Sequence, residues 1–310
     1  MLENLALDNN RFTGEIPQSI GNLPFLQFLD FSDNQLSGSL PTGLGALSSL
    51  KTLKLAYNQL TGKIPVALGN LDNLNILDLA YNNLTGSIPD TFDNLPATLI
   101  DLSSNQLSGN IPEIINSLSQ LQWLDLSNNQ LTGMIPSLSS LDQLQVLNLA
   151  HNELSGYIPV ELADCFRLQY LVLNNNQFNG PLPGFMLNDI VHIQVENNQL
   201  SGEFPPGIFT ESLQYLDASN NQLSGILPAT LSSPNLKTLK VSNNNLSGSL
   251  DPSLGKGYIW DVLLLNGNKL SGSVPASLQP MTKFGQCDLS NNKFDCPAPA
   301  WLSVQCGFSC

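Results

Sequence analysis

Three aspartates at near-constant spacing are the side chains best suited to acid–base chemistry. Asp78, Asp101 and Asp125 follow one another at intervals of 23 and 24 residues. On neighbouring strands of one sheet, their carboxylates would lie about 4.8 Å apart for each strand. Like charges at such a distance raise each other's pKa values. Because retaining glycosidases use two carboxyl groups about 5 Å apart, this spacing is compatible with glycoside hydrolysis.

Other catalytic groups are scarce. His151 and His192 are the only histidines, and the sequence places neither in a nucleophile–base constellation. It also contains no phosphate-binding loop. An aspartate row on an open sheet lacks the water-excluded pocket that such chemistry needs. We therefore predict that the chain is not an enzyme, and we expect neither a cofactor nor a bound metal.

The aspartates belong to a repeat that runs through the whole chain. The motif L-x-L-x-x-N-x-L-x-G occurs at residues 5–14 in a variant form, and again at 53–62, 124–133 and 263–272. A period of 22 to 24 residues, held over thirteen copies, predicts a leucine-rich-repeat solenoid with one continuous core. The repeated asparagines are Asn10, Asn34, Asn58, Asn82, Asn105, Asn129, Asn152, Asn176, Asn198, Asn221, Asn244, Asn268 and Asn292.

Each position of the repeat has a structural interpretation. Leu124 and Leu126 alternate with outward residues, which predicts a short strand, and stacked strands form one parallel sheet. The aligned asparagines supply both a donor and an acceptor to backbone groups of the turn. Glycine and an apolar–proline pair then lead into short convex segments, where we expect 3₁₀ turns. We expect Leu5, Leu53, Leu126 and Leu265 to be buried.

The element after the asparagine carries a family resemblance. Residues 58–65, NQLTGKIP, contain the G-x-[IL]-P pattern and resemble the plant-specific class of leucine-rich repeats. That class includes receptor-kinase ectodomains, receptor-like proteins and polygalacturonase-inhibiting proteins. The resemblance implies an α/β solenoid, a right-handed superhelix with one long parallel concave β-sheet and short 3₁₀ convex segments. It also implies an extracellular or cell-surface setting and a protein, peptide or glycan ligand.

The two ends of the chain differ. Such proteins usually carry an N-terminal cap with paired cysteines, and none is visible, so we predict a repeat array over residues 1–286 without that cap. Residues 287–310 would hold the last repeat and a cysteine-rich C-terminal cap. Four cysteines allow three pairings, and the absence of a C-x-x-C pair disfavours zinc. The predicted disulfide cysteines are Cys287, Cys296, Cys306 and Cys310.

Charge and hydropathy restrict the partners. The formal net charge is -14, and no basic stripe is present, which argues against nucleic acid and anionic membranes and favours a basic partner. No apolar run approaches the roughly 20 residues of a membrane-spanning helix. Met1 begins inside a repeat, so no signal peptide is visible, and an extracellular location is inferred from the resemblance alone. Asn83 and Asn245 begin N-x-[ST] sequons and are predicted glycosylation sites.

The outward strand positions define the predicted ligand site. They carry aromatic and apolar side chains that the core does not need, beside the aspartates. Trp123 is the expected anchor, and the aspartates would select a cationic or hydroxyl-rich partner. The predicted concave-face site comprises Tyr57, Asp78, Tyr81, Asp101, Trp123, Asp125, Asn148, His151 and Tyr170.

The sequence favours an extracellular recognition module, with two alternatives. Rows of Ser and Thr before the repeat glycine are compatible with an ice-binding protein, although Glu15, Lys63 and Tyr157 interrupt a uniform plane. Inhibition of a secreted cell-wall hydrolase would be a specialised form of recognition. Thermal hysteresis would identify the ice-binding alternative.

Overall fold

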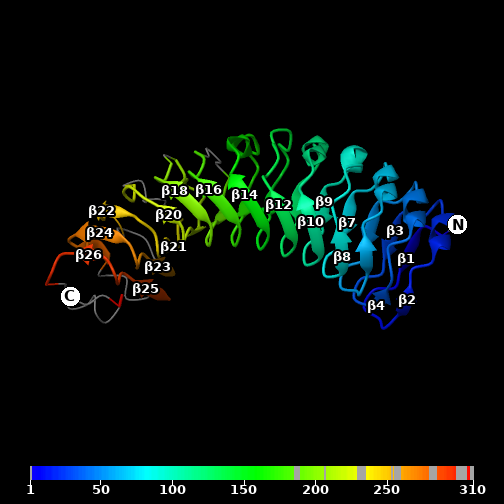
Figure 1. The fold of residues 1–310 in the computed structure, drawn as a ribbon, viewed down its shortest axis with the longest axis horizontal. Helices are drawn as coiled ribbons and strands as arrows, with labels where there is room; N and C mark the ends of the chain where they lie inside the picture. Colours follow the sequence, from blue (N-terminus) through cyan, green and yellow to red (C-terminus); the bar gives the residue numbers. More distant parts are fainter. Residues whose placement is uncertain are drawn as a thin grey trace. The chain divides into compact units, whose positions relative to one another are not determined.

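The computed structural model describes residues 2–184, 189–205, 207–228, 235–252, 254, 260–278, 285–297 and 306–307. The chain forms two compact units, residues 1–155 and residues 156–310. Both are built from the same coil, in which a strand is followed by a turn, a second short strand and a convex segment (Figure 1). The predicted leucine-rich-repeat solenoid is confirmed.

In the first unit, one strand from each coil joins a parallel sheet, here called the main sheet. A leucine or isoleucine occupies the middle of each strand and pairs with its counterpart, as Leu53 does with Leu77. The middle side chain faces the core, and the flanking residues face away from it. The strands are β1 (Asn4–Ala6), β3 (Phe28–Asp30), β5 (Thr52–Lys54), β7 (Ile76–Asp78), β9 (Leu99–Asp101), β11 (Trp123–Asp125) and β13 (Val146–Asn148).

The main sheet of the second unit follows the same rule, except that Cys287 occupies the middle of β25. Its strands pair in parallel with unchanged register, so that Tyr170, His192 and Tyr215 occupy equivalent positions. These strands are β15 (Tyr170–Val172), β17 (His192–Gln194), β19 (Tyr215–Asp217), β21 (Thr238–Lys240), β23 (Val262–Leu264) and β25 (Gln286–Asp288).

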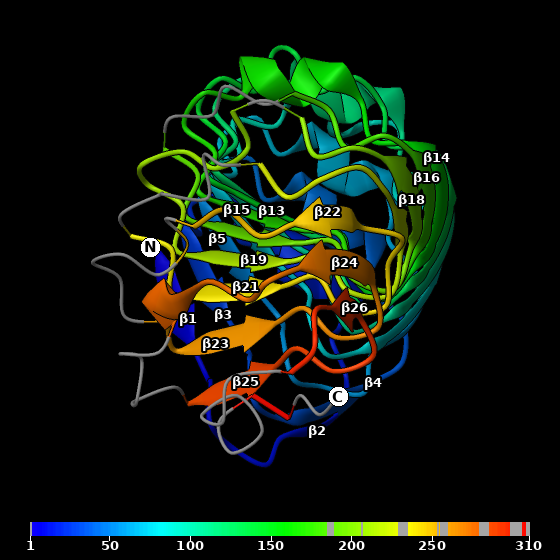
Figure 2. The ribbon, with the colours of Figure 1, turned by 90° about the vertical axis from the view of Figure 1, so that its left-hand side faces the viewer.

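Short strands after the repeated asparagine form further parallel sheets, which the sequence analysis did not predict. In the end view of Figure 2, β16 and β18 are set apart from β15 and β19. In the first unit they are β2 (Thr13–Glu15), β4 (Gln35–Ser37), β6 (Thr61–Lys63), β8 (Asn83–Gly86), β10 (Gln106–Asn110) and β12 (Gln130–Gly133), with β14 (Glu153–Tyr157) at the division. In the second they are β16 (Gln177–Gly180), β18 (Gln199–Gly202), β20 (Gln222–Leu223), β22 (Ser247–Ser249), β24 (Lys269–Gly272) and β26 (Lys293–Phe294).

The repeat glycine is required by this second strand. At Gly180 the φ angle is +73°, and a Cβ atom would lie 2.3 Å from ring atoms of Tyr157 in the preceding coil. At Gly38 the φ angle is +74°, and the corresponding contact, with Glu15, is 2.6 Å. The residue after one glycine therefore lies across the next glycine, which explains why glycine occupies this position in twelve of the thirteen repeats, with Cys296 at the equivalent position of the last.

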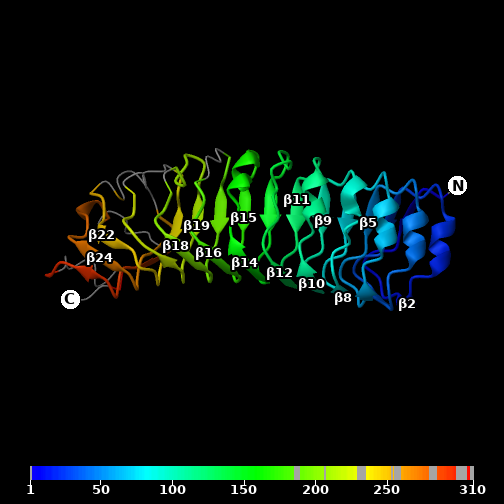
Figure 3. The ribbon, with the colours of Figure 1, turned by 45° about the horizontal axis from the view of Figure 1, so that its top comes forward.

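The convex segments contain 3₁₀ helices, as predicted. Most of them begin directly after the repeated proline, whose φ near -70° suits the position before the first turn, as at Pro17 and Pro41; η4 begins after Thr91 instead. Figure 3 shows the first of them as short coiled ribbons, blue to cyan, in sequence order. They are η1 (Gln18–Asn22), η2 (Thr42–Ala46), η3 (Val66–Asn70), η4 (Phe92–Asn94) and η5 (Glu113–Ser117), with η6 (Val160–Asp164) and η8 (Ala276–Leu278) in the second unit.

The repeated asparagines have the double role expected of them. Asn82 donates from Nδ2 to the carbonyl of Leu55 in the preceding coil at 3.0 Å and to that of Leu79 in its own coil at 3.2 Å. Its Oδ1 accepts the backbone N–H of Leu60 at 3.0 Å. Because one side chain pairs backbone groups of two coils, the ladder fixes the stacking of neighbouring repeats.

The core follows the leucine positions, with one exception. Leu53, Leu126 and Leu265 are fully buried, as predicted. Leu5 is only partly buried, so the expectation for this residue was wrong. Within the described structure Leu5 pairs with Leu29 on one side, and the other side of its coil carries no neighbouring strand.

The structure describes three of the four predicted disulfide cysteines. Cys287 and Cys306 form a disulfide with a Cα–Cα distance of 4.5 Å, and Cys296 is also disulfide-bonded. Cys310 lies outside the described residues. The thiol of Cys165 is buried at a core position that leucine occupies in other repeats. The boundary between array and cap at residue 286 stays a prediction.

Candidate ligand-binding faces

The outward face of the first unit's main sheet carries a row of carboxylates. Asp78, Asp101 and Asp125 are direct partners across β7, β9 and β11. Each carboxylate also closes its own turn, because its Oδ1 accepts the backbone N–H two residues later. These distances are 3.2, 3.0 and 2.9 Å for Asp78, Asp101 and Asp125 respectively. Part of the row's hydrogen-bonding capacity is thus used by the fold.

Burial makes this row easier to protonate. The pKa of Asp101 is raised to about 6, first by burial and then by the charges of Asp125 and Asp78, while hydrogen bonds from Ser103 oppose the shift. Burial also raises the pKa of Asp78, against the charge of Lys54. The sequence analysis expected like-charge repulsion. That repulsion is present, but loss of water is the larger cause.

Asn148 is hydrogen-bonded to the end of the aspartate row. Its Nδ2 donates to Oδ2 of Asp125 at 2.8 Å, and its Oδ1 accepts the backbone N–H of Ala150 at 3.2 Å. Asp125 also accepts the hydroxyl hydrogen of Ser127 at 2.6 Å. Both oxygens of Asp125 are therefore engaged. Asp101, between Asp78 and Asp125, has one oxygen outside the turn contact described above.

Two tyrosines follow β5 and β7 and stack on each other. The rings of Tyr57 and Tyr81 have centroids 4.3 Å apart and planes 10° from parallel, and both side chains are half-exposed. Their φ angles are +55° and +51°, and His151 has +55° at the equivalent position. Asparagine occupies this position in several other coils, including at Asn128. Bulky residues are uncommon in left-handed backbone, so these aromatics carry a conformational cost that the fold does not require.

Trp123 is the largest exposed aromatic side chain of this face. It begins β11, retains 41% exposure and pairs in register with Leu99 and Val146 on either side. The tyrosine pair stands at the opposite end of its strands, beyond Asp78. The face therefore has an apolar region around Trp123, a carboxylate row and an aromatic stack. The predicted residues Tyr57 to His151 all lie in this unit.

Tyr170 falls in the second unit, in a different cluster. Its ring lies 5.7 Å from that of His192, and His192 stacks on Tyr215 with centroids 4.2 Å apart and planes 6° from parallel. Lys240 continues the series, with Nζ 5.2 Å from the ring centroid of Tyr215. Tyr170, His192 and Tyr215 thus stack at equivalent positions on successive strands, and Lys240, whose register partner is Asp217, reaches the Tyr215 ring from the next outward position of β21.

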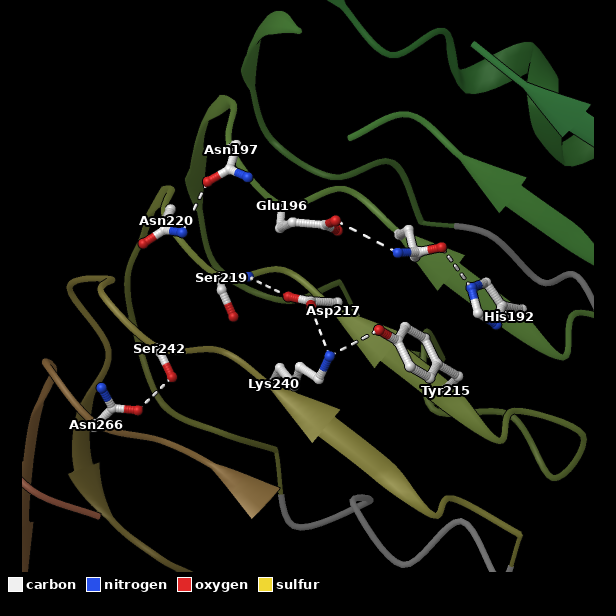
Figure 4. Close-up of polar contacts among 11 residues, drawn as sticks. His192, Glu196, Asn197, Tyr215, Asp217, Ser219, Asn220, Lys240, Ser242 and Asn266 are labelled. Carbon is white, nitrogen blue, oxygen red and sulfur yellow. Dashed lines mark hydrogen bonds and ion pairs between the residues drawn. The ribbon is translucent and has the colours of Figure 1, made fainter. Parts of the chain in front are cut away.

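The same face of the second unit carries an ion pair and a polar chain. Lys240 lies 3.3 Å from Asp217 Oδ2 and donates to the Tyr215 hydroxyl at 3.0 Å (Figure 4). Nε2 of His192 is 2.9 Å from Oε1 of Gln194, whose Nε2 donates to Glu196 at 3.4 Å. The sequence analysis did not propose this cluster. The outward Asp217 and Lys240 on adjacent strands were the available signal.

Three other features bear on the predicted sites. Asn83 and Asn245, the sequon asparagines, are both exposed, and Oδ1 of Asn245 accepts from Lys269 at 2.8 Å. An apolar pocket lies at the first coil, and none of the predicted site residues lines it; its walls include Phe12, Ile16 and Leu36. Among the described residues, no helix has the length and apolarity to cross a bilayer.

Comparisons with known proteins agree with the repeat architecture. Residues 1–60, 48–107 and 119–178 match the leucine rich repeat family, as do residues 98–118, and residues 211–254 match its two-copy form. A comparison with curated protein sequences finds no match. Many solved structures are similar.

Two similar structures are peptide receptors. A plant peptide hormone receptor, RGFR1 in complex with RGF2, is 33% identical over 94% of this chain and 52% of its own, with a TM-score of 0.80. The Arabidopsis receptor kinase HAESA, in complex with the peptide hormone IDA and the co-receptor SERK1, is 31% identical over 97% and 59%, with a TM-score of 0.72. The chain thus spans little more than half the length of these receptor structures.

A third similar structure has another activity. A plant ice-binding protein is 31% identical over 86% of this chain and 80% of its own, with a TM-score of 0.61.

Proposed function

Because the chain belongs to the plant-type leucine-rich-repeat family, we propose that it is a non-enzymatic recognition module of the cell exterior. Its ligand is a peptide or protein segment with a basic group, bound on the outward main-sheet face of the first unit. The similar receptor structures with bound peptide hormones support a ligand-binding role, and the ectodomain setting of HAESA supports an extracellular location. The specific ligand follows from the chemistry of this face.

The observation that carries the proposal is an exposed tryptophan beside partly buried carboxylates. Trp123 offers a large apolar contact at low conformational cost, which is typical of residues that dominate binding energy. Asp125 is the next outward residue after Trp123 on the same strand, and Asp101 is its partner on the neighbouring strand. Both carboxylates attract a cationic group. The strained and stacked Tyr57 and Tyr81 extend the apolar surface. A protein that used this face only for solubility would not need these residues.

A peptide library tests the proposal without a known ligand. The full chain is immobilised and panned with random dodecapeptides displayed on phage, and the peptides recovered on the wild type are then tested for binding to the Trp123→Ala variant. We expect the surviving peptides to be enriched in Lys or Arg and in apolar residues. Enrichment of peptides that bind the Trp123→Ala variant equally well, or no enrichment at all, would contradict the proposal.

Ice binding is the second candidate function, and two observations favour it. The match to the similar plant ice-binding protein covers 80% of that protein's length. Thr61, Thr85 and Thr132 lie on β6, β8 and β12, which belong to the short strands after the repeated asparagine. Against it, the exposed Met134 and Ile226 interrupt the polar plane. Thermal hysteresis of the purified chain decides this alternative. Inhibition of a cell-wall hydrolase is a special case of the first proposal, in which the ligand is the hydrolase itself.

A further inference from the structure

Two tyrosine side chains of the first unit are in direct ring contact. Tyr57 and Tyr81 stack with their centroids 4.3 Å apart and their planes 10° from parallel. Both side chains are about half exposed, at 50% and 48%, so dissolved reagents reach them. Within the described part of the chain, which leaves out Tyr258, this is the one contact between two tyrosine rings. The pair therefore combines proximity with access.

The backbone keeps the two tyrosines in register. They occupy equivalent places in neighbouring coils, three residues beyond the ends of β5 and β7. The N–H of Tyr57 donates to the carbonyl of Ala80 at 3.0 Å, and the carbonyl of Tyr81 accepts the N–H of Asn58 at 3.2 Å. Both tyrosines have the same left-handed backbone conformation. Rotation about the side-chain bonds is thus the motion that changes the distance between the rings.

The phenol ends of the pair also interact. Partial burial raises the pKa of the Tyr57 phenol, and the Tyr81 phenol raises it further through its charge and a hydrogen bond. Such a hydrogen bond brings together the hydroxyl-bearing edges of the two rings, and with them the ring carbons ortho to each hydroxyl. Asp33 and Ser104 occupy the equivalent positions in the coils on either side, so no third ring extends the stack.

We propose that Tyr57 and Tyr81 form an oxidative modification site, at which a haem peroxidase with hydrogen peroxide joins the two rings as dityrosine. Each phenol loses one electron and one proton to give a phenoxyl radical. The two radicals couple through a carbon–carbon bond between ring positions ortho to the hydroxyls, and the hydrogens of these two carbons move to the phenol oxygens. The product has two hydrogen atoms fewer than the two tyrosines, and these reduce one hydrogen peroxide to two water molecules.

The stacked pair favours coupling within one chain. Groups held in contact react at effective concentrations far above those of dissolved molecules. Tyr157 is more exposed, at 65%, but none of the described tyrosine rings is in contact with it. Tyr170 and Tyr215 lie on alternate strands with the ring of His192 between them. The geometry therefore selects Tyr57 and Tyr81 over the other described tyrosines.

The cross-link would tie two neighbouring coils together outside the core. It encloses residues 57–81, and a covalent bond between such distant positions restricts the unfolded chain and so favours the folded one. The site includes two rings of the proposed peptide-binding face. It does not depend on peptide binding, because coupling requires only the two phenols and the oxidant.

Trypsin separates the two tyrosines, which makes the cross-link directly measurable. Cleavage at lysine and arginine places Tyr57 in peptide 55–63 and Tyr81 in peptide 64–167. The full chain is treated at low concentration with a haem peroxidase and hydrogen peroxide, and the monomer is isolated by gel filtration, digested and analysed by mass spectrometry. We expect the two peptides to appear as one species that is lighter than their sum by two hydrogen atoms and has the blue fluorescence of dityrosine.

Two conservative variants assign the cross-link to its residues. Tyr81→Phe keeps the stacked ring but lacks the phenol, and we expect it to lose the joined peptide. Tyr157→Phe removes an exposed tyrosine from the same tryptic peptide and should form the joined peptide as the wild type does. Circular dichroism verifies that both variants are folded. Absence of the joined peptide from the wild-type monomer, or its persistence in Tyr81→Phe, would overturn the proposal.

Discussion

Removing one rung of the asparagine ladder should destabilise the chain by an amount that depends on the position of the rung. Asn82 is 7% exposed and its Oδ1 accepts the backbone N–H of Leu60. The carbonyls of Leu55 and Leu79 also accept from Asn58 and Asn105, so they keep a partner when Asn82 is lost. The Leu60 N–H is the group left buried without a partner in Asn82→Ala.

The magnitude follows from that one group. A buried unsatisfied donor costs about 1–3 kcal/mol, and the net loss of the remaining hydrogen bonds adds about 1 kcal/mol. Asn82→Ala should therefore lower the free energy of unfolding by about 2–4 kcal/mol. Asn10 is the matched control, because it is exposed and its Nδ2 donates only to carbonyls of its own turn. Asn10→Ala should cost less than about 1 kcal/mol.

Urea unfolding monitored by circular dichroism measures both variants. Where the variants share the same slope of unfolding free energy against urea concentration, a change in the midpoint of the unfolding transition reports a change in stability. We expect Asn82→Ala to unfold at a clearly lower urea concentration than Asn10→Ala. Equal losses for the two variants, or a negligible loss for Asn82→Ala, would refute the account of coil stacking given above.

Three further predictions concern charge, strain and modification. Because the folded pKa of Asp101 is raised to about 6, the folded chain binds this proton more tightly than the unfolded chain, so stability falls as pH rises from 4 to 6. Melting temperatures of Asp101→Asn should lack that part of the decline, and an unchanged profile would contradict the assignment. Tyr81→Asn should stabilise the chain by about 1 kcal/mol, because asparagine tolerates the left-handed backbone, while weakening binding of peptides selected on the first unit; a loss of stability would argue against strain. Expression in a secretory host should add glycan mass at Asn83 and Asn245, removable by peptide N-glycosidase and absent in Thr85→Ala with Ser247→Ala; no mass difference would remove both sites from the proposal.

Residues with a local role in the coil were predictable from the sequence. Leu53 and Asn58 recur at fixed spacing because each coil meets the same neighbours, so periodicity alone specifies their burial and hydrogen bonds. The strands after the asparagine were missed because they are formed by glycine and short polar residues, such as Thr61–Lys63, that lack alternating hydrophobicity. These strands form because one coil closely approaches the next, and the sequence of a single repeat does not reveal that approach.

The candidate sites were only partly predictable. Trp123 and the aspartate row stand out because the core does not require them. The contribution of burial to the pKa of Asp101, and the use of Asn148 by Asp125, depend on side-chain packing across strands.

The central claim is that the outward face of the first unit's main sheet binds the ligand through Trp123. Isothermal titration of a selected basic peptide against wild type, Trp123→Ala and Phe25→Ala tests it most directly. Phe25 is a control because it is an exposed aromatic, at 49%, that precedes β3 outside the strand face. The account predicts at least tenfold weaker binding for Trp123→Ala, about 1.4 kcal/mol, and no change for Phe25→Ala. Normal binding by Trp123→Ala together with loss of binding by Phe25→Ala would contradict it.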